Sequence, residues 1–109
     1  MNKLSLDALA RKHMETAAAA SAGRSSETFY GGHEQTLRQT LIALTKGNAL
    51  SEHPNPGEST VLVLRGRVRL KAGGDSWEAR TNDLLVMPRE EASLEALEDS
   101  AVVLTVAKR

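Results

Sequence analysis

Two spacings of apolar residues divide this chain. In residues 4–20 the apolar side chains recur every three or four positions, which places them on one face of an α-helix. Ser5 precedes the first turn as an N-cap, and Asp7 meets the positive end of the helix dipole. Gly23 is positioned to end the helix, and residues 24–26 read as a linker. The stripe consists of Leu6, Leu9, Ala10, His13 and Ala17. A stripe this narrow predicts packing on a sheet or a partner subunit, with His13 as a packed side chain.

From Glu27 onward the apolar spacing changes to two, as expected for strands. In residues 36–45, Leu37, Gln39, Leu41 and Ala43 share one face, and the opposite face is also partly apolar. One face should therefore line an interior while the other meets a second layer. Further strands are predicted at residues 28–30, 60–65, 68–72, 76–80, 84–87, 93–97 and 101–107, with a buried strand at 84–87. Short strands separated by Gly, Asn and Pro turns indicate an all-β sandwich or barrel.

Residues 52–70 form the stretch around which the other strands are organised. A polar, turn-forming segment comes first, followed by an apolar strand, Gly66 and a second alternating strand. This order predicts a hairpin at the mouth of a small barrel, with Gly66 as its turn.

Length and composition limit the alternatives. A chain of 109 residues is one domain, with residues 1–26 as helix and linker and residues 27–109 as the barrel. Its 14 basic and 14 acidic residues balance, so no overall charge steers it to a nucleic acid or a membrane surface. It has no cysteine, and no apolar run approaches the ~20 residues of a membrane span. We therefore expect a cytoplasmic protein.

The spacing of residues 47–66 resembles the first motif of the cupins, a family of small jelly-roll barrels. That motif runs glycine, five residues, His-x-His, three or four residues, glutamate, six residues, glycine. Gly47 and His53 match it, while Asn55 replaces the second histidine. Counting back from Gly66, Ser59 occupies the glutamate position and Glu58 lies one residue early.

The second cupin motif is matched in spacing more than in chemistry. Asn82 stands at its first glycine, where asparagine tolerates a left-handed backbone, and Pro88 is in place. Glu90 replaces the next glycine. Ser93 stands at the histidine position by strict count, and Ala92 does so if the loop is one residue shorter. The resemblance implies a cupin jelly-roll β-barrel, and the apolar stripe of residues 4–20 adds one N-terminal α-helix. Because three histidines and a glutamate form the usual metal site, it also implies that this site is incomplete.

Other candidate sites remain open. A non-standard metal site would combine His53, Glu58 and His33, provided that a bulge before Glu58 turns its side chain inward. Arg65, Arg67, Arg69 and Lys71 form a basic ladder without interleaved aromatic residues. That pattern favours a solvated strand face over a nucleic-acid site.

Two classes of function follow. The first is a cupin-fold regulatory or small-molecule-binding protein without metal or other cofactor, whose polar ligand contacts are His53, Asn55 and Gln39. The second is a cupin enzyme, either a metal-dependent oxygenase or isomerase with substituted ligands, or a metal-free isomerase or lyase with His53 as general base. The sequence names no second catalytic group. Strands that are apolar on both faces, together with the resemblance, predict a homodimer.

Overall fold

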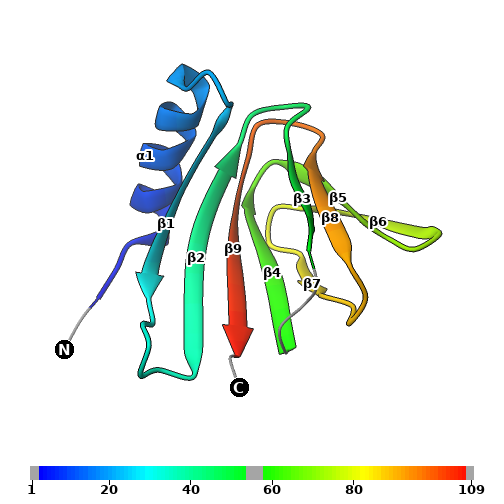
Figure 1. Ribbon diagram of the computed structural model, residues 1–109. Coiled ribbons are helices and arrows are strands. Elements are labelled where there is room, and N and C mark those ends of the chain that lie inside the picture. The colour runs from blue at the N-terminus through cyan, green and yellow to red at the C-terminus, as the bar shows by residue number, and fades with distance from the viewer. Residues whose placement is uncertain (1–2, 54–57, 108–109) are drawn as a thin grey trace.

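The computed structural model describes residues 3–53 and 58–107, and within them one helix precedes nine strands. The strands form two antiparallel sheets with the orders β1-β2-β9-β4-β7 and β3-β8-β5-β6. The helix lies along the outer face of the five-stranded sheet, beside β1 and β2 (Figure 1). This is the two-sheet architecture of a jelly roll, as predicted. The elements are α1 (Leu6–Ala19), β1 (Arg24–Tyr30), β2 (Leu37–Leu44), β3 (Ala49–His53), β4 (Glu58–Arg65), β5 (Arg67–Ala72), β6 (Asp75–Arg80), β7 (Leu84–Val86), β8 (Ala92–Ala96) and β9 (Ser100–Ala107).

Alternating residues of the five-stranded sheet build two separate cores. Ile42 of β2 faces the second sheet, whereas its neighbour Leu41 packs under the helix. Val102 and Val103 of β9 divide in the same way. The two apolar faces predicted for this sheet therefore have different covers, the second sheet on the inside and the helix on the outside. The inner core consists of Ile42, Leu44, Val61, Val63, Val68, Leu70, Ala72, Ala79, Ala92, Leu94, Ala96 and Val102.

The helix begins where the sequence predicts. The Ser5 hydroxyl accepts a hydrogen bond from the Ala8 N–H at 3.1 Å, which satisfies one free donor of the first turn. Ala10 is fully buried and has a small side chain, so the helix approaches Leu41 closely. Asp7 pairs with Arg65 of β4, and also with Arg11 one turn further along the helix. The hydrogen bond from Arg65, followed by that from Arg11, lowers the pKa of Asp7.

The chain crosses from one sheet to the other at Gly66. β4 pairs with β7 and β9, whereas β5 pairs with β6 and β8, so the hairpin predicted for this stretch is wrong. The backbone of Gly66 has a φ of 86°, and a Cβ there would collide with Ser100 and with the carbonyl oxygen of Asp99. Ser100 is buried, and its hydroxyl accepts from the Arg67 N–H at 3.1 Å and donates to the Glu98 carbonyl at 2.7 Å. Glycine is needed here for the crossing between sheets.

Three further differences concern the chain before the central strands. Residues 24–26 are the start of β1 and not a linker, because Gly23, with a φ of 68°, turns the chain into the sheet. The helix itself ends earlier, at Ala19. The strand β3 was missed, since its sequence mixes polar and apolar residues and reads as loop.

The strand β7 is an edge strand and not a buried one. It pairs with β4 alone, and its outward side chains Leu84 and Val86 are 59% and 76% exposed. The turn before it contains Asn82 with a φ of 73°, which confirms the left-handed backbone expected at that residue.

Candidate functional site

An open cavity of about 430 Å³ lies beside β1, β2 and the start of β3. Ligand pockets in proteins commonly measure about 300–1,000 Å³, so the cavity is large enough for a small molecule. Three separate segments contribute to it, and the turn after the helix forms one side. The lining residues are Ala22, Arg24, Ser25, Ser26, Thr40, Ile42 and Leu50.

The strand register explains which side chains face this cavity. Ser26 pairs with Ile42, which belongs to the inner core, and directly paired residues share one face of a sheet. Arg24 lies two residues before Ser26 and therefore on the same face. Ile42 and Leu50 supply the apolar wall, while Thr40 adds a hydroxyl whose oxygen lies 2.9 Å from that of Thr28. On this face the cavity thus combines the Arg24 cation, the hydroxyls of Ser26 and Thr40, and an aliphatic surface.

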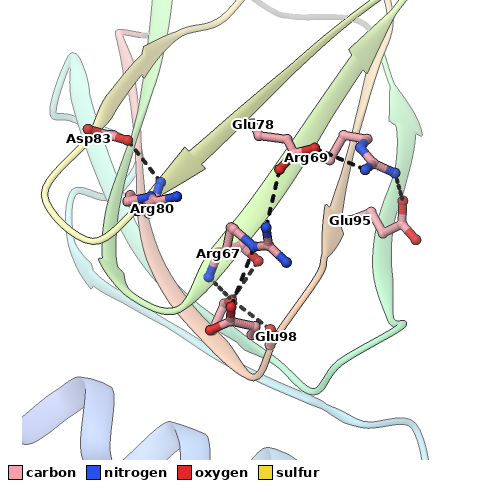
Figure 2. A network of polar contacts seen from close by, with 8 residues as sticks. Arg67, Arg69, Glu78, Arg80, Asp83, Glu95 and Glu98 are labelled. Atoms are coloured by element: carbon pink, nitrogen blue, oxygen red, sulfur yellow. Dashed lines mark hydrogen bonds and ion pairs between the residues drawn. The ribbon is translucent and has the colours of Figure 1, made fainter.

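Arg24 has no carboxylate partner among residues 3–50 and 58–107, the residues whose side chains the structure describes. The arginines on the outer face of the four-stranded sheet differ in this respect (Figure 2). Arg69 lies 3.1 Å from Glu78, and the Arg67 Nε lies 3.4 Å from a Glu98 carboxylate oxygen. The cation of Arg24 is therefore available to a ligand, whereas those of β5 are neutralised by the protein.

The basic ladder predicted for β5 is part of a mixed-charge surface. Glu78 of β6 lies near both Arg67 and Arg69 (Figure 2). Glu95 of β8 lies 3.9 Å from Arg69 and 3.8 Å from Lys71. Arg65, the remaining member of the ladder, pairs with Asp7 of the helix. These side chains are partly exposed, so the pairs add little stability and chiefly cancel the local charge.

The positions of the cupin metal motifs hold side chains that do not fit the usual metal. Ser59, at the motif glutamate, is buried on the inner face, and Ala92, at one of the two candidate histidine positions, is also buried. A methyl group offers no ligand atom, and a neutral hydroxyl is a poor substitute for carboxylate or imidazole. Within the part of the chain that the structure describes, no group of three histidine, aspartate or glutamate side chains is arranged to hold a metal ion.

The register also corrects the expectation for Glu58. Consecutive pairing of Glu58 with Ala107 and of Ser59 with Val106 leaves no bulge between the two residues. Glu58 is therefore exposed on the face opposite to Ser59, away from the interior that a non-standard metal site would need. His33 lies exposed in the turn between β1 and β2.

The predicted ligand residues are not gathered in the described cavity. Gln39 lies on the outer face of β2, where its amide donates to the Thr105 hydroxyl at 3.2 Å, so its predicted position in the interior is wrong. The backbone of His53 pairs with Ala92, while Asn55 and the His53 side chain lie outside the described residues. Arg24 and Ser26 were missed because their segment read as a linker. The alternation that begins directly after Gly23 is the signal that points to a strand there.

His13 is packed between helix and sheet, as predicted. Its Nδ1 lies 2.7 Å from the Ser25 hydroxyl and its Nε2 lies 2.8 Å from a Glu27 carboxylate oxygen. The hydrogen bond from His13 is the main cause of the lowered pKa of Glu27, and the Lys12 cation assists.

The Ser25 hydroxyl, the His13 imidazole and the Glu27 carboxylate are linked in the order found in serine hydrolases. However, Ser25 pairs with Ala43 and faces the helix, on the side of β1 opposite to Arg24 and Ser26. The three side chains therefore fasten the helix to β1 and do not present a nucleophile to the cavity.

Comparison with solved structures defines the fold. A conserved protein of unknown function from Streptococcus pyogenes is 25% identical, with a TM-score of 0.73 over 83% of this chain and 78% of that one. A cupin superfamily protein from Desulfitobacterium hafniense is 14% identical, with a TM-score of 0.72 over 79% of this chain and 78% of that one. An RmlC-like cupin from Desulfovibrio desulfuricans is 22% identical, with a TM-score of 0.68 over 77% and 81%. No protein-family model matches the sequence, and neither does any curated protein.

The chain is thus a small cupin-fold domain, as its motif spacing predicts. Its N-terminal helix lies on the outer face of one sheet. Among the described residues, no helix has both the length and the apolar character needed to cross a membrane.

Proposed function

We propose that this cupin-fold protein binds a small molecule without the usual cupin metal. The cavity beside β1 and β2 supports this proposal, because it offers a cation, hydroxyls and an aliphatic wall on a rigid scaffold. Ser59 at the motif glutamate, and Ser93 or Ala92 at the motif histidine, support the second part, since none of them is a suitable ligand. A binding or regulatory role is favoured over catalysis, because the groups found in the cavity are of the kinds that hold and orient a ligand.

Elemental analysis tests the metal-free part of the proposal. After dialysis, the purified protein should contain far less than one iron, manganese, nickel, copper or zinc per chain. About one such metal per chain, lost in a His53→Ala variant, would contradict the proposal and favour the metal-enzyme alternative.

A screen of small molecules by protein-detected NMR tests the binding part. Charged and neutral compounds should shift the amide resonances of the cavity residues, above all those of Ser26, Thr40 and Leu50. A screen in which no compound shifts these resonances would contradict binding at this cavity.

We also propose that two copies of the chain form a homodimer. The helix covers only part of the outer face of the five-stranded sheet, and Leu84 and Val86 of edge strand β7 stay exposed. A second copy that covers these side chains would bury apolar surface that a monomer leaves in water.

A further inference from the structure

We propose that the ligand of the cavity is a compact hydroxy acid whose carboxylate binds Arg24. This inference rests on the proposed small-molecule function and adds the chemical class of the ligand. It joins three properties of one site: an unpaired cation, neighbouring hydroxyls and an aliphatic wall.

The guanidinium of Arg24 lies at the cavity without a carboxylate partner among the described side chains. Its side chain lines the cavity, and no acidic side chain among residues 3–50 and 58–107 neutralises it. Arg67 and Arg69, on the far face of the other sheet, each have carboxylate partners. A guanidinium presents parallel N–H donors that match the two oxygens of a carboxylate. The unpaired cation therefore selects an anionic group of this shape.

Two hydroxyl groups, those of Ser26 and Thr40, line the cavity beside that cation. Ser26 is two residues from Arg24 on the same strand face, which separates their Cα atoms by roughly 7 Å. Thr40 lines the cavity from β2, and its oxygen already shares a hydrogen bond with Thr28. A hydroxyl both donates and accepts, so Ser26 and Thr40 suit an alcohol group carried a few bonds away from the carboxylate.

The rest of the cavity wall is aliphatic. Ile42 and Leu50 present aliphatic carbon to the cavity, and Ile42 is only 7% exposed. A short alkyl chain buried against them is removed from water, which favours its binding. A carboxylate, one hydroxyl and a short alkyl chain together describe a compound such as 3-hydroxyhexanoate.

The matched probes are 3-hydroxyhexanoate and its primary amide, which differ in charge but hardly in shape. Titration of the isotope-labelled full chain, followed by NMR, should show the carboxylate shifting the resonances of Ser26, Thr40 and Leu50. Because Arg24 is exposed at the cavity mouth, we expect a Kd on the order of a millimolar. The amide should bind about tenfold more weakly or worse, since it loses the charge-assisted hydrogen bonds.

Variants of Arg24 localise the effect. Arg24→Gln should weaken 3-hydroxyhexanoate binding about tenfold and leave amide binding unchanged, while Arg24→Lys should lie between. The control is Arg80→Gln, which removes an exposed arginine from edge strand β6 and should change neither affinity. Spectra of each variant report whether the fold is retained.

The possible outcomes distinguish a failure of the carboxylate inference from a failure of the proposed small-molecule binding. Equal affinity for acid and amide, or an Arg24→Gln protein that binds the acid normally, would overturn the carboxylate inference but leave a small-molecule site. Failure of the acid to shift the cavity resonances, while neutral compounds of the screen do so, would have the same meaning. If neither charged nor neutral compounds shift them, both the inference and the proposed function are wrong.

Discussion

A single glycine decides how the two sheets are connected, and its substitution should be costly. Gly66→Ala combines a positive φ with a collision against Ser100, so the free energy of unfolding should fall by about 2 kcal/mol or more. Urea denaturation measures this fall. Gly74→Ala is the control, because no heavy atom lies within 4 Å of the added Cβ, and its effect should stay within about 0.5 kcal/mol. Equal stability of the two variants would contradict the role assigned to Gly66.

His53 is the one motif histidine that the sequence retains, and we expect it to affect binding more than folding. His53→Ala should lower stability by about 1 kcal/mol, the net value of one hydrogen bond. Binding of those screen compounds that shift the amide resonance of residue 53 should weaken. A variant that unfolds far more easily, or that binds those compounds as well as the parent does, would place the ligand contacts elsewhere.

At the scale of elements, the helix is held to the sheet partly by charge. Hydrogen bonding from His13 lowers the pKa of Glu27 from its ordinary value of 4.5, with the Lys12 cation also nearby. The ionised form is thus the one stabilised in the folded chain. This contribution is complete above about pH 4.5 and is lost as the pH falls through the lower folded pKa.

Glu27→Gln should therefore flatten the acid dependence of stability. Between pH 7 and about pH 3, the variant should lose less free energy of unfolding than the parent does. Urea denaturation at both pH values measures the difference. Glu34→Gln, at an exposed carboxylate in the turn between β1 and β2, should keep the dependence of the parent. Identical slopes for Glu27→Gln and the parent would contradict the prediction.

The strands also show which parts of the fold can be predicted from the sequence. Period-two segments predicted most of the strands, and motif spacing placed Ser59, and either Ser93 or Ala92, at positions of metal ligands. The pairing of strands was not predictable in the same way, because alternation around Gly66 fits a hairpin and a crossing between sheets equally well. Arg24 and Leu50 meet at the cavity from segments that carry no shared motif, so only the folded chain reveals that site.

At the scale of the whole molecule, the homodimer proposal is tested through edge strand β7. Light scattering at micromolar concentration should give twice the chain mass, and Val86→Lys should shift it toward the monomer, since a charge there opposes burial. At 76% exposure, Val86 tolerates lysine in the folded monomer. The matched control is Trp77→Lys, at another exposed apolar residue, on β6 of the other sheet. A parent protein with monomer mass would contradict the proposal.

The central place of β9 has a consequence for how the chain is made. This strand joins β2 to β4, yet it is the last strand of the domain to leave the ribosome. Until residues 100–107 emerge, β2 and β4 have apolar faces and unpaired edges with no strand between them. Nascent chains of this kind are prone to aggregate or to bind chaperones. Synthesis stalled before residue 100 should therefore leave a protease-sensitive chain, whereas release of the full strand should protect both halves of the sheet together.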